Sequence, residues 1–172
     1  MIPRPGEVTH ITVVVKDLRK TMETYRKIFG WEPWEGFVLK APKHYETMLR
    51  GKPVHFSMEA ASTMVGPVNY EIIQPLEGKS AYTEWLDRHG EGFQHISYWH
   101  WLSREDTDSA LKHFEQMGIS VLMSGKIKDG LQYYYMDSDK DLKVHVEIAC
   151  GKTAVVKPDW VYPKSRIQLL DS

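Results

Sequence analysis

The stretches YEIIQPLEGKS (residues 70–80) and WLDRHGEGFQH (residues 85–95) lie at the junction between the two halves of the chain. The first stretch opens with apolar and β-branched residues, which is typical of a strand. Residues 80–89 follow, and the helical spacing of their apolar side chains predicts a linking helix. His95 then lies at the start of another apolar strand. The two stretches therefore indicate a boundary between two structural units.

The residues on either side of this boundary repeat one order of elements, which indicates an internal duplication. Residues 8–15 (VTHITVVV) predict a strand buried on both faces, and residues 17–29 predict a helix that ends at Gly30. A second helix is predicted after His95, over about residues 106–117. Three strands are predicted after each helix, at residues 36–40, 54–60 and 69–74 in the first half and at 120–124, 131–136 and 143–149 in the second. Each half is therefore a βαβββ module.

These elements divide the chain into four parts within one α+β structural domain. Residues 1–78 and 93–150 form the two modules, and residues 79–92 link them. Within the first module, residues 41–53 are expected to form a loop. Residues 151–172 contain two prolines and a tryptophan, which indicates an extended strap over the surface.

The composition indicates a soluble protein without a strong overall charge. The 22 Lys and Arg side chains nearly balance 23 Asp and Glu side chains, so neither nucleic acid nor an anionic membrane is an expected partner. No apolar run of about 18 residues is present, which argues against a transmembrane helix. Because Cys150 is the single cysteine and no signal-like segment precedes the first strand, we expect a cytoplasmic protein.

Each module carries a histidine near the start of its first strand and a glutamate in its last strand. These residues are His10, Glu71, His95 and Glu147. Because side chains alternate along a strand, both glutamates point away from apolar neighbours such as Ile72. A buried, unpaired carboxylate costs several kcal/mol. Two glutamates at equivalent positions therefore predict a bound cation.

Each of these residues, taken alone, has a simpler explanation. A single strand histidine is usually an ordinary core or surface residue, and a single strand glutamate usually faces solvent. Independent residues would have no reason to recur in register in both modules, so the repetition favours a metal site. Two imidazoles and two carboxylates suit one divalent ion of Co, Zn, Ni, Mn or Fe, and they suit Ca poorly.

The same stretches resemble the vicinal oxygen chelate (glyoxalase) superfamily, and its methylmalonyl-CoA epimerases in particular. The resemblance covers about residues 8–150. Its most specific part is the strand of Glu71, which ends in a Pro-Leu turn and leads through the linking helix to a Gly-x-Gly approach to His95. The resemblance implies a curved, mixed eight-stranded sheet around a metal held by the four residues above. The epimerases carry two adjacent histidines where this chain has Gln94-His95.

The resemblance also implies a reaction, namely epimerisation or isomerisation at the carbon α to a carbonyl. A small-molecule substrate with two vicinal oxygens would chelate the metal, which would stabilise the enolate formed when the α-proton leaves. Acyl-CoA thioesters such as methylmalonyl-CoA are the first candidates for this substrate. A carboxylate in a dry pocket would act as the base, and the candidates are Glu147 and Glu46, with Glu59 behind them.

Three further residues are candidates for contacting the substrate. Asn69 and His145 lie on the same strand faces as the two predicted glutamate ligands. Alternatively, His145 is an ordinary strand histidine that is partly exposed to solvent and contacts no substrate. Tyr133, Tyr134 and Tyr135 are consecutive, so alternation directs either Tyr134 alone or the other two toward the cavity. Tyr134 is our candidate for a substrate contact.

Other functions of the same superfamily are alternatives. A lactoylglutathione lyase would use the same four ligands, whereas an extradiol dioxygenase normally binds Fe(II) through two histidines and one glutamate, so Glu71 argues against it. A non-catalytic binding protein of the bleomycin-resistance type would have the fold without the metal, and the intact ligand set argues against that function. By the same resemblance, we expect a homodimer in which a partner chain covers the sheet edges.

Overall fold

The computed structural model describes residues 8–98, 103–128, 130–151 and 157–163. The first module comprises β1 (Val8–Val14), α1 (Leu18–Phe29), β2 (Trp34–Leu39), β3 (His44–Leu49), β4 (Lys52–Pro53), β5 (Ser57–Val65) and β6 (Val68–Glu77). The linking helix is α2 (Ala81–His89). The remaining elements are β7 (Gly92–Tyr98), α3 (Arg104–Gln116), β8 (Val121–Ile127), β9 (Leu131–Met136), α4 (Asp139–Leu142), β10 (His145–Cys150) and β11 (Trp160–Tyr162).

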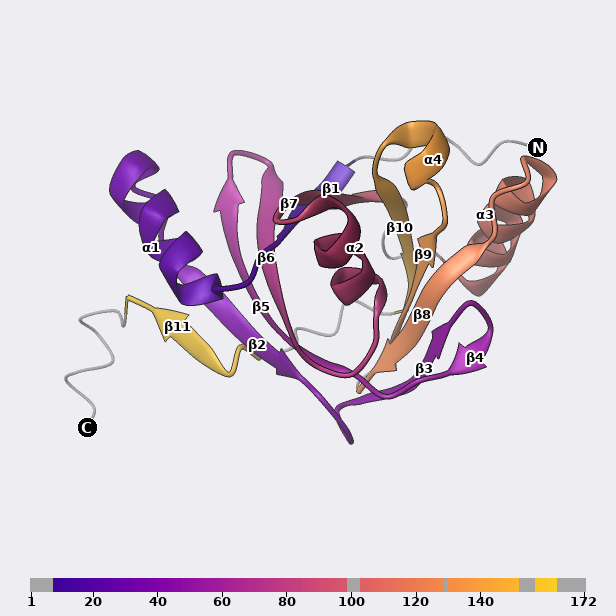
Figure 1. Ribbon diagram of the computed structural model, residues 1–172, viewed down its shortest axis with the longest axis horizontal. Helices are drawn as coiled ribbons and strands as arrows, with labels where there is room; N and C mark the ends of the chain where they lie inside the picture. Colours follow the sequence, from indigo (N-terminus) through magenta and orange to yellow (C-terminus); the bar gives the residue numbers. More distant parts are fainter. Residues whose placement is uncertain (1–7, 99–102, 129, 152–156, 164–172) are drawn as a thin grey trace.

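The strands of the described residues form one continuous sheet in the order β11-β2-β5-β6-β1-β7-β10-β9-β8-β3-β4. β1 and β7 pair antiparallel at its centre, and each is parallel to the last strand of its own module, β6 or β10. Figure 1 shows the sheet curved into a half-barrel, with α2 between its two arms and α1 and α3 outside them. The predicted α+β fold with a curved mixed sheet is confirmed, but the sheet has eleven strands rather than eight.

The three additional strands come from segments that we expected to be a loop and a strap. Residues 41–53 contain the hairpin of β3 and β4, which turns at Arg50 and Gly51 with φ values of 47° and 73°. β3 pairs with the edge strand of the second module, β8, and β11 pairs with β2 of the first. The expected loop at 41–53 was therefore wrong. Of the expected strap, residues 157–163 run along β2, and the other residues of the tail after Gly151 lie outside the described part of the chain.

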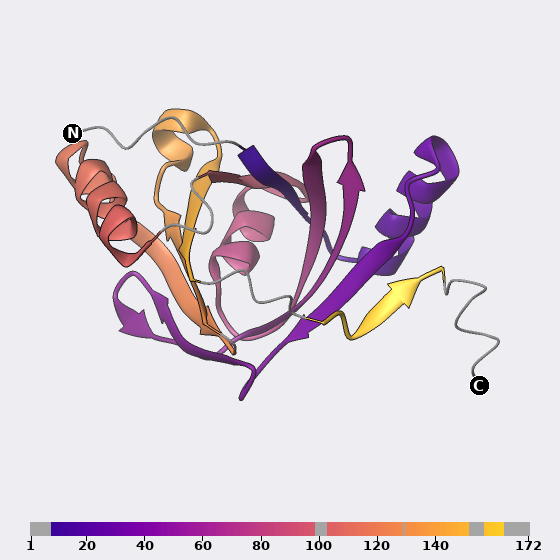
Figure 2. The ribbon, with the colours of Figure 1, turned by 180° about the vertical axis from the view of Figure 1, so that it is seen from behind.

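The two faces of the sheet carry different side chains because residues alternate along each strand. The outer face is apolar and packs against the helices, with Ile72 of β6 beneath α1 and Ile148 of β10 beneath α3. The concave face meets α2, whose Tyr82 and Trp85 are almost fully buried. Polar side chains that lie on the concave face therefore point into the space between the arms. The view from behind shows the two arms of the sheet with α2 between them (Figure 2).

The helices begin and end at residues with clear capping roles. The Asp17 carboxylate accepts a hydrogen bond from the Lys20 backbone N–H at 2.9 Å at the start of α1, and Gly30 ends the helix with a φ of 70°. Ser80 and Thr83 form a capping box at the start of α2. The capping box fixes the start of α2, whose apolar side chains Tyr82 and Trp85 pack inside the half-barrel.

His44 of β3 is a buried histidine away from the centre of the sheet. It is 3% exposed, its Nε2 lies 2.7 Å from the Tyr133 hydroxyl, and its ring packs edge-on against Phe56. Burial lowers the pKa of His44 from 6.5 to about 4. The unfolded chain binds a proton at this residue below about pH 6.5, whereas the folded chain stays neutral until about pH 4.

We therefore expect the free energy of unfolding to fall as the pH drops from 6.5 to 4, with up to about 3 kcal/mol of the fall due to His44. In the His44→Gln variant, this share of the pH dependence should disappear, because glutamine does not titrate. Urea unfolding of both proteins at about pH 4.5 and pH 7 measures the difference. An equal pH dependence in both proteins would contradict the assignment.

Candidate metal centre

The four predicted ligands come from four neighbouring strands at the centre of the sheet. Their strands are β6 (Glu71), β1 (His10), β7 (His95) and β10 (Glu147). Thr12 of β1 is the register partner of both Glu71 and His95, so these three residues share one face of the sheet. The duplicated topology therefore brings together residues that are far apart in the sequence.

The donor atoms of these side chains lie close together. His10 Nε2 is 3.3 Å from His95 Nε2 and 2.8 Å from Glu147 Oε2. His95 Nε2 is 3.9 Å from both Glu71 Oε2 and Glu147 Oε2. Ligand atoms bound to one ion at about 2.0–2.2 Å lie about 3 to 4.4 Å apart, so these distances suit a common cation. Metal binding itself stays a prediction.

Neighbouring side chains orient two of these groups. Gln94 Oε1 lies 2.5 Å from His95 Nδ1, and both residues are fully buried. An N–H donated by Nδ1 to this oxygen leaves the Nε2 lone pair directed at the cluster, which is the usual arrangement of a metal-binding histidine. Thr12 donates its hydroxyl to Glu71 Oε2 at 2.8 Å. Gln94, which the sequence comparison treated only as a departure from the family, thus acquires a definite role as a positioning residue.

The electrostatics of the cluster also favour a cation. Burial raises the pKa of Glu71, and the nearby Glu147 carboxylate raises it further. Burial alone would lower the pKa of His10, but the carboxylates of Glu147 and Glu71 outweigh that effect and raise it. The raised pKa of His10 reflects the two carboxylates beside it, and the raised pKa of Glu71 reflects mainly its burial. A divalent ion would compensate the charge of the two carboxylates.

The cluster forms part of the wall of a cavity of about 250 Å³ on the concave face of the sheet. Its lining is largely apolar and aromatic, and the described residues of the lining include no lysine or arginine. Besides His10, Glu71 and Glu147, the cavity is lined by Glu35, Phe37, Leu39, Met58, Ala60, Ser62, Asn69, Ile73, Tyr82, Ile127, Leu131, Tyr133 and Tyr135.

The predicted substrate contacts lie in three different environments. Asn69 lines the cavity, and its Oδ1 is buried without a hydrogen-bond partner among the described residues. Tyr134 lies on the outer face of the sheet, where its hydroxyl is 3.0 Å from Arg104 of α3, and it is Tyr133 and Tyr135 that face the cavity. His145 is fully buried but does not line the cavity.

Two of the three candidate bases lie outside the cavity. Glu46 has a φ of 49° at an irregularity in β3, and its carboxylate, which is 61% exposed, forms an ion pair with Lys126 at 2.5 Å. Glu59 lies on the outer face, where it pairs with Arg19 at 2.6 Å and accepts a hydrogen bond from Trp160. Of the predicted bases, only Glu147 is in the cavity.

Glu35 of β2 is a cavity residue that the sequence analysis missed. It is the register partner of Ser62 on β5, and Ser62 is the partner of Glu71 on β6, so the three side chains share the concave face. With two strand spacings of about 4.8 Å, the Cα atoms of Glu35 and Glu71 lie about 10 Å apart. Alternation with Phe37 and Leu39 was the signal for Glu35, but the predicted strand began at residue 36, two residues after the observed start at Trp34, and so left Glu35 out.

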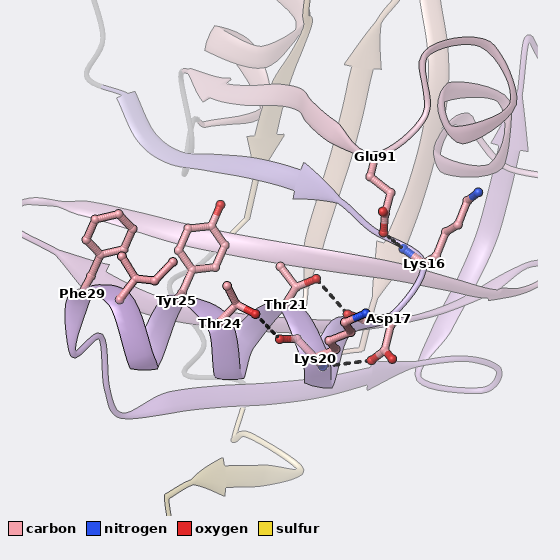
Figure 3. A pocket seen from close by; sticks show the side chains of 9 residues that line it. Lys16, Asp17, Lys20, Thr21, Thr24, Tyr25, Phe29 and Glu91 are labelled. Carbon is pink, nitrogen blue, oxygen red and sulfur yellow. Dashed lines mark hydrogen bonds between the residues drawn. The ribbon is translucent and has the colours of Figure 1, made fainter.

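A larger hollow of about 540 Å³ lies elsewhere, along α1 (Figure 3). It is lined by Lys16, Asp17, Lys20, Thr21, Thr24, Tyr25, Ile28, Phe29 and Glu91. Asp17, Thr21 and Thr24 are engaged in hydrogen bonds within or at the start of the helix. The described residues of its lining include neither a histidine nor a member of the central cluster, so we place the functional site at the smaller cavity.

Comparison with protein families identifies the class of this chain. Residues 9–135 match the family model of the glyoxalase/bleomycin resistance protein/dioxygenase superfamily. The chain therefore belongs to this superfamily, as its resemblance to the vicinal oxygen chelate proteins predicted. A search of curated proteins gives no match.

Solved structures share the fold at low sequence identity. Methylmalonyl-CoA epimerase from Mycobacterium tuberculosis is 16% identical, with a TM-score of 0.60 over 88% of this chain and 93% of that chain. A variant of the Streptomyces coelicolor epimerase in complex with 2-nitronate-propionyl-CoA is 21% identical, with a TM-score of 0.54 over 87% and 96%. A hypothetical protein from Bacillus halodurans is 16% identical, with a TM-score of 0.58 over 86% and 95%. These similarities show a common fold.

No helix in the described ranges is long and apolar enough to cross a membrane. The homodimer and the cytoplasmic location stay predictions.

We expect the Glu147→Ala variant to bind one divalent ion per chain fewer than the wild-type protein, because it loses a donor and leaves His10 without its carboxylate partner. Elemental analysis after saturation with Co²⁺ or Zn²⁺ and dialysis measures the content. Glu77→Ala, which removes an exposed carboxylate from β6, is the matched control and should bind as much metal as the wild type. Equal metal content in all three proteins would contradict the four-ligand site.

Gln94→Leu should lower the metal affinity about 10- to 100-fold, because it removes the acceptor that orients His95. Titration with a chelator of known affinity measures the change. The control is Gln132→Leu. It removes a glutamine of β9 whose side-chain oxygen accepts a hydrogen bond from Arg104, and it should leave the metal affinity unchanged. An unchanged affinity in Gln94→Leu would show that His95 is oriented without Gln94.

Proposed function

We propose that this protein is a divalent-metal-dependent epimerase, isomerase or lyase that removes a proton from the carbon α to a carbonyl group. One observation carries the proposal. Four side chains with metal-binding groups converge at a largely apolar cavity, and three of them, His10, Glu71 and Glu147, line it. A further carboxylate, the exposed Glu35, lines the same cavity two strands from Glu71. A non-catalytic binding protein would need an apolar cavity, but it would not need two carboxylates and two imidazoles gathered at one place in its wall.

His10, Glu71, His95 and Glu147 would hold the metal ion, and Gln94 and Thr12 would keep His95 and Glu71 in position. When bound, the ion would supply Lewis-acid stabilisation for negative charge on the substrate oxygens. Asn69 offers its buried Oδ1 as an acceptor for a hydroxyl or amide N–H of the substrate. The chain itself thus supplies groups that bind and orient a substrate with vicinal oxygens.

Glu147 and Glu35 are the proposed proton-transfer groups. Glu147 is 5% exposed beside His10, so it would act next to the chelated oxygens, whereas Glu35 is an exposed lining residue of β2, two strands from Glu71. Two carboxylates on different sides of a bound substrate would allow a proton to leave one face and return to the other. This arrangement is what epimerisation needs, whereas a lyase or isomerase would need only one of them.

The cavity favours a substrate with a small apolar body. About 250 Å³ is below the usual range for sites that enclose drug-sized ligands, so an acyl-CoA would place only its acyl end inside. The described lining offers no lysine or arginine for a phosphate or a distant carboxylate. Acyl-CoA thioesters thus stay in the proposal with their nucleotide part outside the cavity, beside small compounds with vicinal carbonyl, carboxylate or hydroxyl oxygens.

The test is exchange of the substrate α-proton in D₂O, followed by proton NMR with the metal-loaded protein. The panel contains methylmalonyl-CoA, a glutathione hemithioacetal and small 2-hydroxy ketones. We expect exchange with at least one class and a loss of about 10²- to 10⁴-fold in Glu35→Gln without loss of metal. Glu32→Gln, which removes a neighbouring carboxylate paired with Arg26 outside the cavity, should keep the wild-type rate.

Two results would change the proposal. Wild-type exchange that persists in Glu35→Gln would assign proton transfer to Glu147 alone and favour the isomerase or lyase. No exchange with any substrate class, in a preparation shown to contain the metal, would contradict the proposed function and favour a binding protein.

A further inference from the structure

A second cluster of metal-binding groups lies where β9 and β10 meet the end of α2. One carboxylate oxygen from each of Asp137 and Asp139 and one ring nitrogen of His145 all lie within 4.8 Å of one another. None of the three residues belongs to the central cluster, and none of them lines the substrate cavity. The short helix α4 and the turn that precedes it supply the aspartates, while His145 is the first residue of β10.

His145 is held as a metal-binding histidine would be. It is fully buried, and its Nδ1 lies 3.1 Å from the Met136 carbonyl oxygen, which accepts an N–H from it. This hydrogen bond leaves Nε2 as the nitrogen with a free lone pair, and Nε2 is buried without a hydrogen-bond partner among the described residues. A buried acceptor without a partner costs about 1–3 kcal/mol, so a cation here would satisfy an otherwise unfavourable group.

The aspartates are only partly neutralised by protein groups. Asp139 is 15% exposed at its side chain and lies 3.5 Å from Arg88 of α2, whose own side chain is 50% exposed. Asp137 is half-buried and forms no ion pair with a described residue. Arg50 also faces both aspartates, but its guanidinium forms an ion pair with Glu84 at 2.8 Å. Arg88 is therefore the only described arginine in an ion pair with these two carboxylates, which lie beside the Nε2 acceptor of His145.

We infer that Asp137, Asp139 and His145 form a second divalent-cation site, selective for borderline ions such as Zn²⁺, Co²⁺ or Mn²⁺. One imidazole and two carboxylates suit these ions, and water would complete the coordination. The ion would join the end of β9, the helix α4 and the start of β10. Its function is structural, because it fixes the strand that carries Glu147 two residues further along. The inference does not depend on the proposed reaction.

Metal content of matched variants tests the second site separately from the first. After saturation with Zn²⁺ and dialysis, we expect two ions per chain in the wild type and one fewer in the double variant Asp137→Asn/Asp139→Asn. Asp141→Asn removes an exposed carboxylate from the same short helix and should keep the wild-type content. His10→Ala, which disables the central cluster, should also lose one ion, and it should do so independently.

A second measurement does not depend on counting ions. In the His10→Ala background, added Zn²⁺ should raise the melting temperature through the remaining site, and adding the two aspartate substitutions should abolish that rise. Far-UV circular dichroism of the apo proteins establishes that the variants are folded. The second site is overturned if the aspartate substitutions change neither the zinc content nor the zinc-dependent melting temperature. If only His10→Ala has no effect, the central site fails while the second site stands.

Discussion

Burial of negative charge at the centre of the sheet is the constraint on which the rest of this structure depends. Glu71 and Glu147 lie on the concave face beside His10 and His95, and an uncompensated carboxylate at such a position costs several kcal/mol. The histidines lie beside these carboxylates in only one register of β6, β1, β7 and β10. A slip of one residue in any of these strands would move its polar side chain to the apolar outer face. Electrostatics and strand pairing are therefore mutually dependent here.

The same alternation extends outward from the centre and creates the cavity. The row that contains Glu71 continues through Ser62 to Glu35, and the next residues on the concave side, Phe37 and Leu39, are apolar. The outer face instead buries its side chains beneath α1 and α3. The helices thus stabilise the sheet from the side that carries no candidate ligands, which leaves the concave side free for polar groups that are costly to bury.

The duplication made the centre of this structure predictable, because matched positions in two modules reveal the candidate ligands without any knowledge of the fold. Alternation along β6 and β10 then predicted the faces of Glu71 and Glu147 correctly. Tyr134 and Glu46 could not be placed in the same way. The sequence does not reveal which of three consecutive tyrosines face the cavity. Glu46 lies beside an irregularity in β3 that alternation does not reveal. β3, β4 and β11 are added at the two ends of the strand order, where long-range pairing determines the conformation more than local pattern does.

These added strands lie beside the walls of the cavity. β11 pairs Val161 with Glu35 on β2, and β3 pairs His44 with Ile127 on β8, and both Glu35 and Ile127 line the cavity. Trp160 covers Gly36, where a Cβ atom would lie within 1.8 Å of the indole ring, so β11 fits β2 closely. The central four strands carry the candidate ligands, whereas the additions pair with strands of the two arms that line the cavity. The cavity wall therefore depends on two kinds of pairing, because the register of the central strands positions the candidate ligands, whereas the added edge strands position Glu35 and Ile127.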